Sequence, residues 1–185
     1  MPTKQLTRVS VLVLILALLA TMPFTNRAYA SKTQVTYQYL VGAGPLCALG
    51  PDACPDIAVS SSNGDMVAVN GTGTLTVHPD SVTGSGNFVH MDSSGNVKGM
   101  GTWTAVQLLS FVSYGSGAAQ GLPPNFFGGE ALIRVHLSAG FDAILKITCV
   151  LGNPPAGKME GIRLTVQGVI NFNKQVSGDT LFILS

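Results

Sequence analysis

The chain has 185 residues, a formal net charge of +1, and charged side chains at only 10 % of its positions. Charge that is sparse and balanced excludes the basic surface by which proteins bind nucleic acid, so we expect no nucleic-acid partner. The motifs Gly-x-Ser-x-Gly, His-x-x-x-His and Cys-x-x-Cys do not occur. The sequence therefore assigns no catalytic residue, no metal and no cofactor, and it favours a protein that is not an enzyme.

The N-terminal residues have the pattern of a secretory signal. Basic residues precede the apolar run 11–20, which is shorter than the about 20 residues that cross a bilayer. Ala28-Tyr29-Ala30 matches the small-x-small rule, so we expect cleavage after Ala30. Residues 1–30 would be the signal peptide and 31–185 a secreted, extracytoplasmic β domain without a transmembrane segment. Retention of the segment as an uncleaved anchor is the alternative. Cleavage leaves seven basic residues against nine acidic ones, a net charge of −2.

The first mature segment, residues 33–41, alternates apolar and polar side chains and predicts a half-buried strand. A loop over 42–56 follows and contains Cys47 and Cys54. In a secreted protein we expect these two cysteines to form a disulfide, which closes a short loop and stabilises the fold by about 2.5 kcal/mol. Cys149 lies in an apolar strand. It is expected to be a buried free thiol, with pairing to one of the other two cysteines as the alternative.

Residues 57–61 and 65–69 flank Asn63-Gly64, which is a strong hairpin signal. The second strand is expected to continue into 71–103. That stretch contains the pattern Gly-x-Gly-x-large three times, ending at Leu75, Phe88 and Trp103. Because strand side chains alternate between faces, each glycine pair shares a face with its large residue.

The first turn of this stretch is expected at 79–82, because proline suits the first corner of a tight turn. That turn would place Gly73 opposite Phe88 and Leu75 opposite Gly86.

The second turn is expected within 93–96, and it would place Phe88 opposite Gly101 and Trp103 opposite Gly86. Each large side chain would then cover a neighbouring glycine, as in strongly bent sheets.

The rest of the chain predicts further short strands. After Trp103 the apolar phase continues through Ala105, Leu109 and Phe111, or it forms a helical turn or two. A loop rich in Gly, Ser and Pro spans 115–129. Clean alternation then predicts strands at 131–137, 143–151, 162–166 and 180–184. Short strands without a confident helix predict an all-β antiparallel domain. Glycine bends favour a single barrel of about 8–10 strands, with a β-sandwich as the alternative.

Gly101-Thr102-Trp103 resembles the Gly-x-Trp motif of lipocalin-type barrels, which bind small apolar ligands in the barrel mouth. In that family the motif lies on the first strand, whereas here it comes far into the mature chain. We therefore assign no family membership and transfer no residue roles.

The best site candidate is His90, which is expected on the same face as Phe88, with Asp92 next on that face. A rim histidine whose nitrogens are satisfied by backbone or water is the alternative. We expect Phe88, His90, Asp92 and Trp103 to line a site for a small apolar or amphipathic molecule. The expected function is a secreted binding module. The alternatives are a structural or cell-envelope interaction protein, and an enzyme that uses His90 and Asp92 as acid and base. The oligomeric state stays open.

Overall fold

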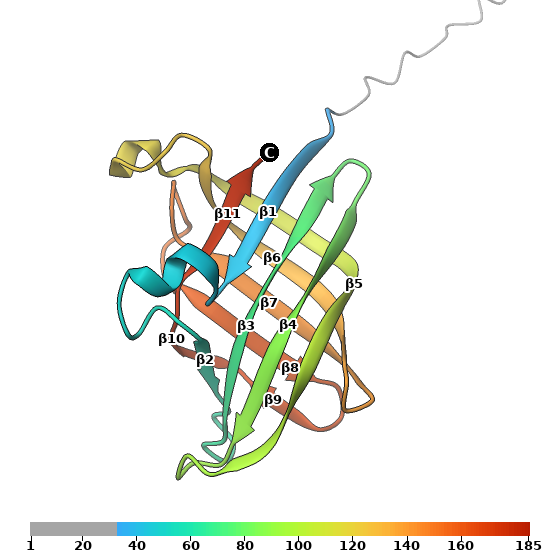
Figure 1. Ribbon diagram of the computed structural model, residues 1–185. Coiled ribbons are helices and arrows are strands. Elements are labelled where there is room, and N and C mark those ends of the chain that lie inside the picture. The colour runs from blue at the N-terminus through green and yellow to red at the C-terminus, as the bar shows by residue number, and fades with distance from the viewer. Residues whose placement is uncertain (1–32) are drawn as a thin grey trace, which may run out of the picture. The chain divides into compact units, whose positions relative to one another are not determined.

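The computed structural model describes residues 33–185 (Figure 1). The expected signal peptide and its cleavage site after Ala30 lie outside the described residues. The described residues form eleven strands and two short 3-10 helices. In this part of the chain we find no helix with the length and apolar character that crossing a membrane requires.

The strands take up most of the described chain. They are β1 (Val35–Val41), β2 (Asp56–Val59), β3 (Met66–Val77), β4 (Ser81–Met91), β5 (Val97–Ser116), β6 (Phe126–Leu137), β7 (Phe141–Cys149), β8 (Gly161–Val166), β9 (Ile170–Phe172), β10 (Lys174–Ser177) and β11 (Thr180–Leu184). The 3-10 helices are η1 (Gly44–Ala48) and η2 (Gly117–Gln120).

All strand pairings are antiparallel, so the all-β antiparallel class is confirmed. Six of the pairings form a closed circuit, because β1 pairs β3, β3 pairs β4, β4 pairs β5, β5 pairs β6, β6 pairs β11, and β11 pairs β1. Outside this circuit β2 pairs the start of β3 and also β10, whereas β7, β8 and β9 follow in turn from β6. Figure 1 shows β3 to β5 crossing in front of β6 to β8.

The second hairpin of the glycine-rich stretch has the predicted register. Phe88 pairs with Gly101, and Trp103 pairs with Gly86. Both large side chains belong to one buried cluster, where Phe88 is 8 % exposed and Trp103 is 1 % exposed. They therefore lie on the same side of their sheet, as the alternation predicted.

The turn of the first hairpin lies two residues earlier than predicted, which shifts the pairing of the two strands by four residues. Thr76 pairs with Ser81, so the turn occupies 77–80 rather than 79–82. His78 takes the left-handed conformation at φ 62°, which bends the chain before Pro79 is reached. As a result Phe88 pairs with Val69 rather than with Gly73. Further along the two strands Gly71 pairs with Gly86, and Gly73 pairs with Gly84.

Two aromatic rings fill the space that these glycines leave bare. A Cβ on Gly71 or Gly86 would overlap the indole of Trp103, and a Cβ on Gly73 or Gly84 would overlap the phenol of Tyr39. The indole donates to the Asn70 carbonyl oxygen and the phenol to the Thr83 carbonyl oxygen, both at 3.0 Å. The glycines thus let two polar-tipped rings reach the backbone of β3 and β4.

The phase predicted after Trp103 is confirmed at Ala105 and Phe111, which pack against the core, and is wrong at Leu109, which is 37 % exposed. Leu108 joins the core instead of Leu109, and the Tyr114 hydroxyl donates to the Glu130 carboxylate, outside that core. Register shifts interrupt the β5–β6 pairing at three places, and each extra residue turns the following side chains to the other face. The segment is a bulged strand and not a helix.

The later strands are close to the predicted ones. Every second side chain of β6, β7 and β8 is buried, namely Ala131, Ile133, Val135, Leu137, Ala143, Leu145, Ile147, Cys149, Ile162, Leu164 and Val166. The loop predicted at 115–129 is shorter, because β5 extends to Ser116 and β6 begins at Phe126. The Cys47–Cys54 disulfide is present, and the buried Cys149 takes part in no disulfide.

Candidate functional site

A small apolar pocket lies where β4 and β5 meet β8 and β9. Its volume is about 190 Å³, and its walls include Phe88, His90, Gly99 and Phe172. The other walls are aliphatic, aromatic or thioether side chains, namely Val67, Met100, Leu137, Ala139, Phe141, Leu164, Val166, Val169 and Ile170. His90 is thus the one polar side chain in the wall.

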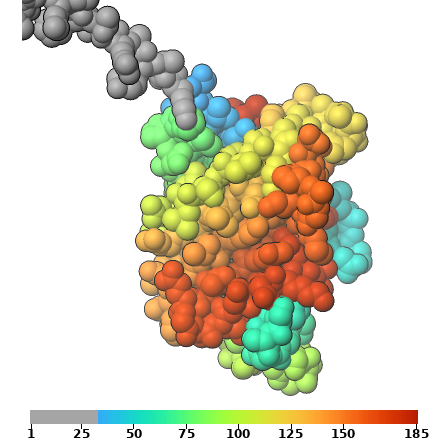
Figure 2. All heavy atoms as spheres, turned by 180° about the vertical axis from the view of Figure 1, so that it is seen from behind, coloured from blue at the N-terminus to red at the C-terminus, as the bar shows by residue number. Residues whose placement is uncertain are grey.

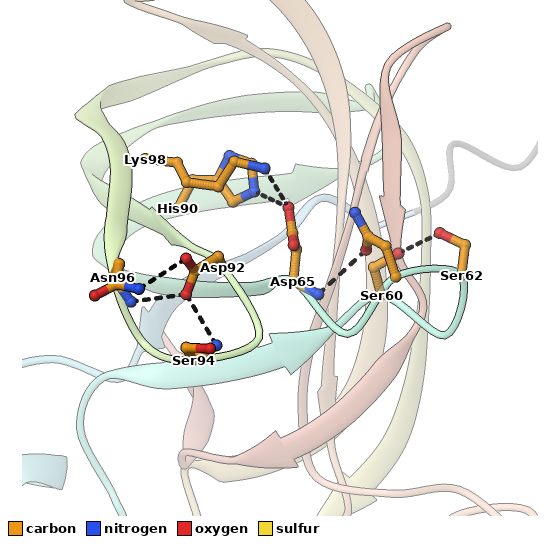
Figure 3. A network of polar contacts seen from close by, with 9 residues as sticks. Ser60, Ser62, Asp65, His90, Asp92, Ser94, Asn96 and Lys98 are labelled. Atoms are coloured by element: carbon orange, nitrogen blue, oxygen red, sulfur yellow. Dashed lines mark hydrogen bonds and ion pairs between the residues drawn. The ribbon is translucent and has the colours of Figure 1, made fainter.

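Hydrogen bonds and ring packing hold the His90 imidazole in place. Its Nε2 lies 2.9 Å from Oδ2 of Asp65, and Lys98 Nζ lies 2.9 Å from the same oxygen (Figure 3). The ring also meets Phe172 edge to face, with the centroids 5.3 Å apart. Because an ionised carboxylate only accepts, Nε2 carries the proton, and Nδ1 of the neutral ring is left as an acceptor.

Asp65 is the carboxylate at this site. It lies in the turn before β3 and is 5 % exposed. The hydrogen bond from Lys98, and then the one from His90, keep the pKa of Asp65 below its usual value. Asp65 is therefore a stable anion that orients His90 and also holds the ammonium group of Lys98.

The structure does not bring Asp92 to His90. Asp92 closes the β4–β5 turn, where its carboxylate accepts from the backbone N–H of Ser94 and of Asn96 and from the Asn96 side chain, each at 2.9 Å. Figure 3 shows it directed toward Asn96, with His90 directed toward Asp65. These hydrogen bonds, with the Asn96 side chain first, keep the pKa of Asp92 below its usual value.

Trp103 lies deeper, in the core and outside the pocket wall. Of the four predicted site residues, the structure therefore places Phe88 and His90 together in the pocket and Asp92 and Trp103 elsewhere. Prediction missed Asp65 because the predicted pairing of β3 with β4 was four residues out of register, which moved Asp65 beyond the end of β4. In the observed register Met66 pairs with Met91, which brings Asp65 to the end of β4.

A group of acidic residues lies at a wide groove near the start of β2, at the opposite end of that strand from Asp65. Asp56 is fully buried, and neither of its carboxyl oxygens has a hydrogen-bond partner in the described part of the chain. Burial, followed by the negative charges of Glu160 and Asp179, raises the pKa of Asp56 to about 9. The Gly42 N–H opposes this shift but donates its own hydrogen bond to the Asp179 carbonyl oxygen at 3.0 Å.

Glycine makes room for this carboxyl group. A Cβ on Gly178, which lines the groove of about 860 Å³, would overlap the carboxyl of Asp56. Burial also raises the pKa of Glu160, but this carboxylate has hydrogen-bond partners that oppose the shift. Its oxygens accept from Val150 N–H at 2.7 Å and from Thr180 N–H at 2.9 Å. Asp56 is thus a neutral acid at pH 7, and Glu160 ties the β7–β8 loop to β11.

The other two histidines lie apart from both sites. His136 Nδ1 lies 2.9 Å from Asp142 Oδ1 on the surface, and His78 is in the β3–β4 turn. Within residues 33–185 no three His, Cys, Asp or Glu side chains are arranged to hold a metal ion. Comparison with known proteins returned no match to a family model, a curated protein or a solved structure. What the protein does is therefore inferred from the chemistry of its own residues.

Proposed function

We propose that the protein is an extracytoplasmic β-barrel module that binds a small, mainly apolar molecule in the His90 pocket without catalysing a reaction. The observation that carries this proposal is the pocket itself: apolar walls, one polar side chain, and a carboxylate that fixes that side chain in one orientation. Ligand sites commonly combine mostly apolar walls with few, well-placed polar groups.

The barrel is supported by the closed circuit of six pairings among β1, β3, β4, β5, β6 and β11. A circuit leaves those six strands without a free edge, as closure of a sheet requires. Glycines lie beneath the rings of Trp103 and Tyr39, and glycine at such positions lets strands bend as the closure of a sheet requires. The disulfide supports an oxidising compartment and hence secretion.

The volume of the pocket limits the size of the ligand. Drug-sized ligands occupy sites of about 300–1,000 Å³, and this pocket has about 190 Å³. A dry apolar cavity of about 150 Å³ in another protein is large enough for benzene. The proposed ligand is therefore a single ring or a short alkyl group, either free or as the end of an amphipathic molecule.

His90 adds a preference for a hydroxyl group on that ligand. Nε2 is committed to Asp65, so Nδ1 is the atom of the neutral ring with which the pocket can accept a hydrogen bond. A phenol or a small alcohol offers an apolar body and one donor. The same geometry speaks against catalysis, since the remaining wall residues supply neither a nucleophile nor a second acid or base.

The test is a titration of the full-length protein with phenol and with benzene, followed by amide chemical shifts. We expect saturable shifts at β4, β5, β8 and β9, with phenol binding more tightly than benzene. Gly99→Leu should abolish both sets of shifts, because the space at Gly99 is open and a leucine side chain there would occupy the pocket. His90→Phe should remove the preference for phenol.

The matched control is Thr102→Leu, which adds the same side chain at an exposed position of the same strand. It should bind phenol as the wild type does. The proposal fails if neither probe shifts the amides of the pocket, or if Gly99→Leu binds as tightly as Thr102→Leu.

The structural or cell-envelope alternative has less support. The pairing path ends at β9 and β10, and these strands have only three and four residues. Short edges are a means by which proteins avoid pairing with other chains. Analytical ultracentrifugation decides the matter, since growth of the assembly with concentration would favour the alternative and a constant monomer would favour the binding module.

A further inference from the structure

A second, polar pocket lies on the face of β6, β7 and β8 that points away from the core. Lys146 on β7 pairs directly with Arg163 on β8, and Thr148 on β7 pairs with Gly161. The loop between β7 and β8 brings Lys158 to the same place, and the pocket has a volume of about 190 Å³. Figure 2 shows the side of the domain formed by these strands, in light orange to red.

Basic side chains are concentrated at this pocket. Residues 33–185 contain six lysines and arginines, namely Lys98, Arg134, Lys146, Lys158, Arg163 and Lys174. Three of them, Lys146, Lys158 and Arg163, line the pocket, and the acidic side chain in its wall is Glu130. Three positive charges against one negative charge give the wall a formal charge of +2. In a mature chain with a net charge of −2, such a local excess attracts anions.

Glu130 positions two of the three cations. Its Oε2 accepts from Lys146 Nζ at 2.8 Å and from Lys158 Nζ at 2.6 Å. Burial raises the pKa of Glu130, but the hydrogen bonds from Lys146 and Lys158 outweigh burial and leave the pKa below its usual value. Glu130 therefore stays ionised and holds both ammonium groups at the pocket while neutralising one of them.

Arg163 and Thr148 each have a side-chain donor with no hydrogen-bond acceptor in the described part of the chain. Arg163 forms no ion pair among the described residues. Its Nε is buried without a hydrogen-bond partner, and so is the Oγ1 of Thr148, whose residue is 1 % exposed. A buried donor without an acceptor is costly. Both atoms belong to residues in the wall of the same pocket, on adjacent strands.

We propose that this pocket binds a small oxyanion, a phosphate or sulfate group, to which Arg163 Nε and Thr148 Oγ1 donate hydrogen bonds. Lys146 and Lys158 add positive charge at its edge. A tetrahedral oxyanion offers several acceptor oxygens at once, and a guanidinium group matches their spacing. This site lies on a different face from the His90 pocket and does not depend on it.

The test is isothermal titration of the full-length protein with inorganic phosphate, with chloride keeping the ionic strength constant. We expect one saturable site. Arg163→Gln should weaken binding about tenfold or more, because it removes a charge-assisted hydrogen bond. Thr148→Val keeps the shape of the side chain and should weaken binding severalfold. Arg134→Gln removes a charge from an exposed position of β6 and should bind as the wild type does.

A second arm uses glycerol 3-phosphate to identify the source of the oxyanion. Tighter binding than inorganic phosphate assigns the site to a phosphate carried on an organic molecule, and weaker binding assigns it to the free ion. The proposal is overturned if phosphate shows no saturable binding to the wild type. It is also overturned if Thr148→Val, Arg163→Gln and Arg134→Gln, each confirmed as folded by its amide spectrum, all bind phosphate equally.

Discussion

His90 and Asp65 form a hydrogen bond of 2.9 Å that joins the fourth strand to the turn before the third. The bond holds the Nε2 end of the imidazole on Asp65, and it places a negative charge beside the ring. Lys98 shares the same carboxylate oxygen at 2.9 Å. The orientation of His90, the one polar residue in the pocket wall, therefore depends on the Asp65 carboxylate, which lies outside that wall.

The first prediction concerns the acid stability that Asp65 confers. Its folded-state pKa is held below the usual value by Lys98 and then by His90. A depressed pKa contributes stability that is present above the unfolded value, about pH 4, and is lost as the pH falls through the folded value. Asp65→Asn should therefore be less stable than the wild type at pH 7, with the difference shrinking toward pH 3. Urea midpoints measured at pH 7, 5, 4 and 3 test this.

Asp80→Asn is the control for that series, because Asp80 is exposed in the β3–β4 turn. It should shift the midpoint little at any pH. A constant difference between Asp65→Asn and the wild type from pH 7 to pH 3 would contradict the assigned role of the carboxylate.

The strands were predictable because apolar alternation and turn residues each leave a local signal. Asn63-Gly64 marks the β2–β3 hairpin, and alternation marks β8 and β11 almost to the residue. The bulges of β5 were not predictable, since no glycine or proline marks the shift near Val106 and the extra residue is defined only against β6. Register depends on the partner strand, and a single sequence contains no partner.

The candidate site was predictable in part for the same reason. Phe88 and His90 lie on one strand, and their shared face follows from a period of two. Asp65 reaches His90 only in the observed register, which the left-handed His78 sets. The burial of Asp56 was not predictable, because an acid at the start of a strand usually caps a turn. Its environment depends on Gly178 and Glu160, which are distant in the sequence.

The second prediction separates glycines that are required from glycines that are not. A Cβ on Gly86 would overlap the Asn70 carbonyl oxygen and the Trp103 indole, whereas a Cβ on Gly99 would meet nothing within 4 Å. Gly86→Ala should lower the free energy of unfolding by about 3 kcal/mol or more, because backbone and indole must both move. Gly99→Ala should stay within about 1 kcal/mol of the wild type. Chemical unfolding of both variants tests this, and equal losses would contradict the packing of Trp103.

The third prediction concerns the thiols. Burial raises the pKa of Cys149 to about 12 and shields its sulfur, so the native protein should react with no thiol reagent. Unfolding without reductant should expose one thiol per chain, and unfolding with reductant should expose three. Reduction under native conditions should cost about 2.5 kcal/mol, the entropic value of the short Cys47–Cys54 loop. A native thiol that reacts rapidly would contradict the burial of Cys149.

The fourth prediction is that Asp56 makes the protein less stable as the pH rises. Its carboxyl group is neutral in the folded state up to about pH 9 and ionised in the unfolded state above about pH 4. A raised folded pKa gives stability that is complete below the unfolded value and is lost as the pH rises through the folded value. The loss is at most about 1.4 kcal/mol per pH unit. Asp56→Asn should remove this slope and be more stable than the wild type at pH 8, while Asp80→Asn should keep the slope. Unfolding midpoints at pH 5, 7 and 9 decide it, since parallel curves for wild type and Asp56→Asn would mean that Asp56 is ionised in the native protein.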